Sequence, residues 1–320
     1  MSRRTLLLVR WGIFLAACAF LFLRLSADQS THALWGEWRN AVDVAAWPVW
    51  GVMFAMAVLN WGIEAAKWRW LVAHLERMSL GRAFAATLAG TTVGLITPNR
   101  TGEFLGRVLF LAPEHRWQGG FATVLGSIAQ FVTTLLIGGA AFVIWWERTP
   151  MVADVGPMWG VVIVVLVAAV AGGALVLFFR PRLLRQLIKV VPLLRRMEGA
   201  AAVLEDYAVR ELMLVFGMSI ARYLVFTAQY VLMLVVLAGI PWQEALVVVP
   251  VIYLVTTLVP TMMLTDLGVR GSASVALLTP VGGSPAVVLL ASFGVWAVNI
   301  AMPALVGGVI LLVARIRTRR

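Results

Sequence analysis

Long apolar stretches alternate with short polar segments along most of the chain. A helix needs about 20 consecutive apolar residues to cross the hydrocarbon core of a bilayer, and stretches of that length recur. We expect six full-length spans, together with two apolar regions that polar residues interrupt near the middle. The spans cover residues 5–25, 46–63, 120–145, 159–179, 212–239 and 288–313, and the interrupted regions cover 84–112 and 244–280.

The composition supports a membrane protein. Of the 320 residues, 62% are hydrophobic and 13% are charged, whereas soluble globular chains have about half apolar and a quarter charged residues. The alternating pattern of an outer-membrane β-barrel is absent. Because backbone groups in lipid must be satisfied internally, the sequence predicts an all-α, polytopic protein with a single transmembrane domain over residues 1–320.

The distribution of basic residues predicts the orientation. The net charge is +11, and the arginines lie at the ends of apolar stretches, which favours contact with lipid headgroups over nucleic acid. Basic segments 64–82 and 180–211 and both termini are expected in the cytoplasm, and 26–45 and 147–158 outside. The segment 180–211 is expected to be a basic amphipathic connection.

These orientations constrain the two interrupted regions. The neighbouring spans require 84–112 to enter and leave from the cytoplasm and 244–280 to enter and leave from outside. The sequence therefore predicts two oppositely oriented re-entrant hairpins and an inverted repeat with halves at 1–145 and 159–314, an arrangement found in many transporters. The alternative is that each interrupted region crosses the membrane completely.

Each predicted hairpin contains a break in its helical pattern. A helix restarting at Gly102 would place Glu103 and Arg107 one turn apart on the same face, with Thr101 as its cap. In the second hairpin, Asp266 and Arg270 have the same spacing. The breaks are predicted at Pro98, Asn99 and Gly102 in the first hairpin and at Pro260, Gly268 and Gly271 in the second.

Charged side chains at membrane depth cost about 3 kcal/mol each on insertion scales, so they usually have a function. The arginines would attract an anionic headgroup, and the carboxylates would pair with them or with a cationic part of the lipid. Alternatively, the hairpin charges pair with one another at headgroup level, and Arg222 extends to the cytoplasmic surface. The candidate substrate-binding residues are Arg100, Glu103, Arg107, Asp266, Arg270 and Arg222.

A further charged segment follows the second span. Its mixture of charged residues and tryptophans is typical of the membrane–water interface, and we interpret it as an interfacial belt. The belt consists of Glu64, Lys67, Trp68, Arg69 and Trp70.

Several kinds of site have no counterpart in the sequence. Neither a Walker motif nor a nucleotide-binding glycine fingerprint occurs, and no serine elbow is present. His32, His74 and His115 lack the spacing of metal ligands, and the only cysteine, Cys18, lies in an apolar stretch. We therefore expect no catalytic residue, no metal and no cofactor.

Three short motifs resemble those of the lysylphosphatidylglycerol synthase transmembrane-region family, whose members are also described as flippase-like domain proteins. The first is Thr97-Pro98-x-Arg100-x-Gly102-Glu103 followed by Arg107, the second is KWRWLVAHL at 67–75, and the third is TDLGVRG at 265–271. In the third motif, Gly271 stands where a glutamate is usual in the family.

The resemblance implies a bacterial inner-membrane protein that translocates a lipid or a lipid-linked headgroup between leaflets. Larger family members carry a soluble aminoacyl-transferase domain, which these 320 residues have no room for, so we expect a stand-alone membrane member. Arg10 and Arg24 favour an uncleaved first span over a signal peptide cut near Ser26 and Ala27.

The leading hypothesis is therefore a non-enzymatic lipid flippase or scramblase whose partners are anionic phospholipids or lipid-linked headgroups. It would be a multi-pass protein of the bacterial cytoplasmic membrane with both termini in the cytoplasm. The sequence leaves monomer and homodimer both open. The alternative is a membrane-embedded enzyme that acts on a lipid phosphate or a polyprenyl carrier.

Overall fold

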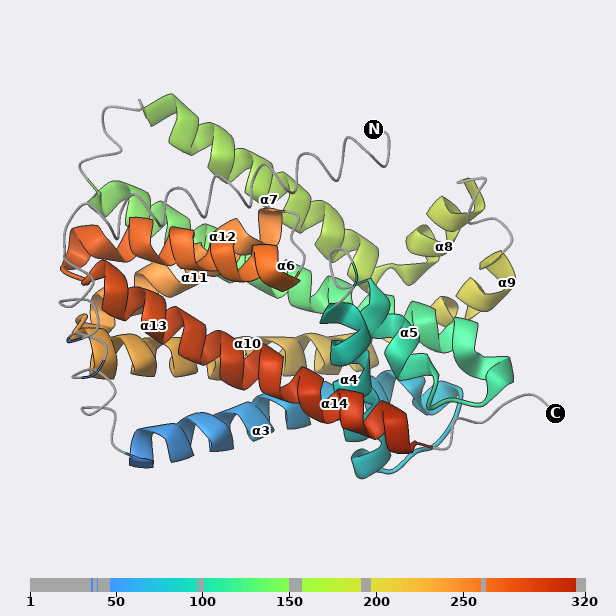
Figure 1. Ribbon diagram of the computed structural model, residues 1–320. Helices are drawn as coiled ribbons and strands as arrows, with labels where there is room; N and C mark the ends of the chain where they lie inside the picture. Colours follow the sequence, from blue (N-terminus) through green and yellow to red (C-terminus); the bar gives the residue numbers. More distant parts are fainter. Residues whose placement is uncertain are drawn as a thin grey trace, which may run out of the picture. The chain divides into compact units, whose positions relative to one another are not determined.

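The computed structural model describes residues 47–95, 97, 101–149, 157–190, 197–259 and 263–314, together with Gly36 and Arg39. Within these ranges the regular structure is helical and no strand occurs, which confirms the all-α class (Figure 1). The predicted span 5–25 lies outside the described residues.

Five of the described helical segments are long and apolar enough to cross a membrane. Each contains or closely matches one of the predicted spans, so the prediction of a polytopic helical membrane protein is confirmed. The segments are Trp47–His74, Pro113–Arg148, Met158–Phe179, Val209–Ala238 and Pro285–Val313.

Most of these segments are built around one long helix, and the last contains a π-helical turn between two shorter helices. Pro303 follows that turn, and the wider π-helical backbone accommodates a residue that cannot donate a hydrogen bond. The bounds are α3 (Trp47–Leu71), α6 (Arg116–Arg148), α7 (Pro157–Phe179), α10 (Val209–Ala238), α13 (Pro285–Trp296), the π-helical turn Ala297–Ala301 and α14 (Met302–Val313).

The two interrupted regions each form a pair of short helices that pack against each other. In the first pair, α4 (Leu80–Leu95) has 16 residues and α5 (Gly102–Val108) has 7. In the second, α11 (Trp242–Leu258) has 17 residues and α12 (Met263–Leu278) has 16. All four helices are shorter than the about 20 residues of a full span, and their direction of entry into the membrane stays a prediction.

The position of the second break differs from the prediction. Gly268 and Gly271 lie inside α12, so the expectation that they interrupt the helix is wrong. A glycine costs a helix only about 1 kcal/mol relative to alanine, and α12 packs against both α11 and α13, which offsets that cost. Gly102 is the first residue of α5, as predicted. Pro98, Asn99 and Pro260 lie outside the described residues.

The chain divides into two compact units, and each contains one hairpin. Unit 1 holds the α11–α12 hairpin, and unit 2 holds the α4–α5 hairpin. Both units draw segments from both predicted sequence halves, and the inverted repeat stays a prediction. Unit 1 comprises Met1–Ala57, Ile137–Gly160 and Phe226–Ala301, and unit 2 comprises Val58–Leu136, Val161–Val225 and Met302–Arg320.

Small residues bring the helices of unit 2 close together. A Cβ atom on Gly106 of α5 would lie 2.6 Å from both the Ala89 carbonyl oxygen and the Gly90 Cα of α4. On another side of α4, the Thr92 hydroxyl donates to the Ala304 carbonyl of α14 at 2.6 Å, and Figure 1 shows these two helices together. Close packing through small residues is typical of helices in membranes, where the hydrophobic effect does not drive association.

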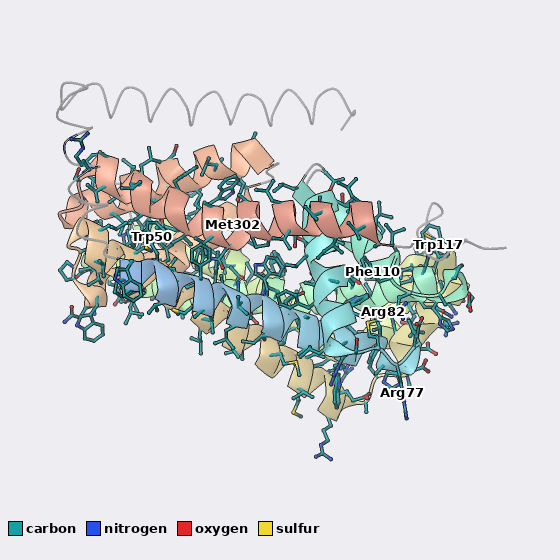
Figure 2. The ribbon with its side chains drawn as sticks, turned by 60° about the horizontal axis from the view of Figure 1, so that its bottom comes forward. Trp50, Arg77, Arg82, Phe110, Trp117 and Met302 are labelled. Carbon is teal, nitrogen blue, oxygen red and sulfur yellow. The ribbon has the colours of Figure 1, made fainter. Side chains whose placement is uncertain are left out.

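An ion pair and a backbone contact hold the ends of the first hairpin together. Arg82, near the start of α4, donates to the carbonyl of Phe110 just beyond α5, and the two residues lie near each other in Figure 2. Arg82 also pairs with Glu76 at 3.1 Å, and Glu76 accepts a hydrogen bond from the Ala112 backbone at 3.0 Å. The two ends of the hairpin are therefore cross-linked by side chains.

The predicted basic connection includes α8 (Pro181–Val190), α9 (Glu198–Ala201) and the 3₁₀ turn Ala202–Glu205. Ion pairs join these elements, Arg185 to Glu205 at 2.8 Å and Lys189 to Glu198 at 3.0 Å.

Within the same connection, the Tyr207 hydroxyl donates to the Leu71 carbonyl at 2.5 Å. Burial raises the pKa of Tyr207 above its usual value. The hydroxyl therefore keeps its proton and anchors the end of α3.

Candidate functional site

The helix that carries the first charged pair begins where the sequence predicts, but with a different cap. Thr101 makes no side-chain cap hydrogen bond, so its predicted capping role is wrong. The Gly102 backbone N–H instead donates to the hydroxyl of Thr97, at 2.7 Å. Thr97 precedes the break and also bonds back to α4, with its hydroxyl 3.1 Å from the Gly94 carbonyl. This side chain thus ties the start of α5 to the end of α4.

Arg107 of α5 joins a cluster of charged residues from three helices of unit 2. Glu64 of α3 lies at its centre. The Glu64 carboxylate lies 2.7 Å from Lys67 Nζ, 2.8 Å from Arg107 Nη1 and 3.5 Å from Arg222 Nε. Arg107 Nη2 lies 3.4 Å from a Glu103 oxygen one turn earlier. We call these five residues the Glu64 cluster.

The Glu64 cluster is buried unevenly. The exposed fractions of the side chains are 2% for Lys67, 5% for Arg107 and 7% for Glu64, against 21% for both Glu103 and Arg222. The cluster has three cations and two carboxylates, so its formal charge is +1. Buried ionic groups are costly unless they are paired, and among the described residues this cluster has one carboxylate fewer than it has cations.

Neutral groups around the cluster satisfy part of its hydrogen-bonding capacity. Lys67 lies 3.4 Å from the Ser219 hydroxyl and 3.5 Å from the Gly126 carbonyl. Arg222 donates to the Gln130 amide oxygen at 3.3 Å, and its guanidinium lies over the Trp61 ring, 5.3 Å from the centroid. These contacts orient Arg222 beside Glu64.

The interpretation of Glu64 and Lys67 as parts of an interfacial belt is wrong. The second span was expected to end at residue 63, but α3 continues to Leu71, which buries both residues and Trp68. Arg69 and Trp70 are exposed. The sequence did contain a signal, because Glu64 and Lys67 are one helical turn apart and face the same side as apolar Trp61 and Trp68.

Unit 1 contains a second buried polar cluster, centred on Arg270 of α12. Its Nη2 lies 3.4 Å from an Asp266 oxygen, and its guanidinium lies over the Tyr253 ring, 5.8 Å from the centroid. Among the described residues, the buried Nε and Nη1 nitrogens of Arg270 have no hydrogen-bond partner.

Hydroxyl groups continue the Arg270 cluster. The Ser274 hydroxyl lies 2.6 Å from the Arg270 carbonyl, to which it can donate, and 2.6 Å from the Tyr230 hydroxyl. Ser292 of α13 lies 3.5 Å from Ser274. The Arg270 cluster thus consists of Asp266, Arg270, Tyr253, Tyr230, Ser274 and Ser292.

The structure groups the predicted site residues as follows. Glu103, Arg107 and Arg222 belong to the Glu64 cluster, and Asp266 and Arg270 form a pair in unit 1. Both i,i+4 ion pairs expected from the sequence are present. Arg100 lies outside the described residues. Among the described residues, no group of three or more His, Cys, Asp or Glu side chains could hold a metal ion.

The family comparison covers nearly the whole chain. The family model described as the lysylphosphatidylglycerol synthase TM region matches residues 8–307. The chain belongs to this family. Both charged clusters fall within the matched range. Neither a curated protein nor a solved structure gave a match. Membership in the lysylphosphatidylglycerol synthase TM family associates the chain with lipid-related function in a membrane.

Proposed function

We propose that the protein is a flippase or scramblase that moves lipids with an anionic or lipid-linked phosphate headgroup between the two leaflets of a membrane. The protein would lie in the bacterial cytoplasmic membrane with both termini in the cytoplasm. It would move the lipid without modifying it. The family match supports the lipid-related part of this role.

The observation that carries the proposal is the formal charge of +1 on the Glu64 cluster within apolar helices. An isolated charge in a bilayer is costly, and a lipid phosphate would supply the missing negative charge. Because Arg222 is the more exposed of the two arginines, it would make the first contact with the headgroup, and Arg107 would receive it deeper in the cluster.

In unit 1, the Arg270 cluster would provide a second contact for a headgroup. The Nε and Nη1 nitrogens of Arg270 can donate to phosphate or ester oxygens, and Asp266 would keep the guanidinium in place.

The test is a leaflet-exchange assay in proteoliposomes that contain fluorescent NBD-labelled phosphatidylglycerol, with dithionite reducing the label in the outer leaflet. We expect the wild-type protein to expose the inner-leaflet label and Arg222→Gln to slow this exchange by about tenfold, equivalent to about 1.4 kcal/mol. Arg148→Gln is the matched control, because it removes the same charge from an exposed position at the end of α6.

Equal exchange by Arg222→Gln and Arg148→Gln would overturn the site, and a wild-type protein no faster than empty liposomes would overturn the transport function. The same lipid should also be incubated with the purified protein in detergent, where leaflets do not exist. Headgroup turnover under those conditions would favour the membrane-embedded enzyme instead.

A further inference from the structure

Glu64 occupies the position that an incoming phosphate would need. Its carboxylate is shared by Lys67, Arg107 and Arg222. The two shortest of these contacts, 2.7 and 2.8 Å, are typical of charge-assisted hydrogen bonds. A phosphate oxygen has the same charge sign and acceptor chemistry as a carboxylate oxygen. Glu64 and a phosphate headgroup would therefore compete for the same cations.

The cluster can still take up an anion while Glu64 is in place. The buried Nε nitrogen of Arg107 has no hydrogen-bond partner in the described part of the chain, and the Arg222 side chain is 21% exposed. Arg222 and Glu103 are its more exposed members, whereas Lys67 and Glu64 are almost fully buried. An anion would therefore approach Arg222 first, with Glu64 on the buried side of the same guanidinium.

We propose that Glu64 is an internal counter-anion that limits the affinity of this site for a phosphate headgroup and so permits its release. The inference rests on the proposed lipid transport. A translocation site must bind its ligand strongly enough to admit it and weakly enough to let it leave. Without the Glu64 charge the cluster would have three cations and one carboxylate, and it would retain a phosphate longer.

Removal of the Glu64 charge is therefore expected to strengthen ligand binding. We expect Glu64→Gln to bind the phosphate headgroup about tenfold more tightly and to exchange lipid more slowly than the wild type. Glu103→Gln should change affinity in the same direction but by less, because solvent screens its more exposed carboxylate. Arg222→Gln should weaken binding. Glu147→Gln, an exposed position on α6 with the same charge change, is the control.

Binding is measured by fluorescence anisotropy of NBD-phosphatidylglycerol titrated with each purified protein in detergent. Unlabelled short-chain phosphatidylglycerol and inorganic phosphate serve as competitors. Competition by the lipid, with little or none by phosphate, would support a lipid headgroup as the ligand. Equally effective competition by inorganic phosphate would assign the site to a soluble anion and overturn the lipid part of the inference.

The two proposals fail in different ways. Tighter binding by Glu64→Gln with no lipid exchange by the wild type would sink the transport function and leave the counter-anion role standing. Unchanged or weaker binding by both Glu64→Gln and Glu103→Gln would overturn the counter-anion role, whatever the exchange assay gives. If Glu64→Gln does not fold, the partly exposed Glu103→Gln decides alone.

Discussion

Each of the two hairpins carries an acidic residue and an arginine at i,i+4 spacing, but the surroundings of the two pairs differ. Arg107 of α5 contacts two carboxylates, one on its own helix and one on α3, with nearest distances of 3.4 and 2.8 Å. Arg270 of α12 contacts one carboxylate on its own helix, at 3.4 Å, and otherwise faces the ring of Tyr253. An i,i+4 charge pattern therefore does not determine how a buried arginine is compensated.

The comparison separates two ways of keeping charge inside a membrane protein. The Glu64 cluster depends on ion pairs between helices, and the loss of its central carboxylate would leave an excess of buried cations. The Arg270 cluster is a local neutral pair surrounded by hydroxyl and aromatic groups. We expect the first to contribute strongly to stability and the second to contribute little.

The largest effect is expected for the central carboxylate. Glu64→Gln should lower the free energy of unfolding by about 3–5 kcal/mol, the usual cost of breaking a buried ion pair. The reason is that the buried Lys67 and Arg107 and the partly exposed Arg222 would then have Glu103 as the one carboxylate of the cluster. Denaturant unfolding of the purified protein in mild detergent measures this change, with Glu147→Gln as the matched control at an exposed site.

A loss of less than about 1 kcal/mol, the range of a surface ion pair, would contradict this account of the Glu64 cluster. A short-chain anionic lipid should restore more stability to Glu64→Gln than to the wild type, because a phosphate replaces the missing charge. An equal gain in both proteins would show that the lipid does not compensate that charge.

The smallest effect is expected in unit 1. Replacing both members of the pair, with Asp266→Asn and Arg270→Met together, should change the free energy of unfolding by only about 1 kcal/mol. Replacement of a whole buried ion pair by neutral groups is often neutral or stabilising. Lipid exchange should nevertheless fall, because the Nε and Nη1 donors of Arg270 are lost. A double variant as unstable as Glu64→Gln would abolish the distinction between the two clusters.

The sequence was sufficient for the main features of the fold. Apolar stretches of full-span length predicted the five described helical segments that are long and apolar enough to cross a membrane, and the Gly102 restart and both i,i+4 pairs were found as expected. Two local features were not. Gly268 and Gly271 suggested a break, but packing of α12 between two helices stabilises a helix that glycine alone disfavours. Thr101 was the predicted cap, yet Thr97, five residues before Gly102, accepts the bond across the break.

The centre of the candidate site was harder to predict. Glu64 and Lys67 follow an apolar stretch, and charges next to tryptophans at such a position usually lie at the membrane surface. Their burial depends on contacts with Arg107 and Arg222. Arg107 lies 43 residues after Glu64, and Arg222 lies on a third helix, α10. A single amino-acid sequence does not reveal which residues far apart along the chain contact one another. The proposed function depends on the excess positive charge of the cluster. This excess results from the contact of α3, α5 and α10 in the folded protein.

The most direct test is native mass spectrometry of the purified protein with its co-purified lipids, comparing wild type, Arg222→Gln and the control Arg148→Gln. Wild type and control are expected to retain an anionic phosphate-bearing lipid, and Arg222→Gln is expected to lose most of it. Equal retention by all three proteins, or a wild-type protein that retains only zwitterionic lipid, would contradict the claim that the Glu64 cluster binds an anionic headgroup.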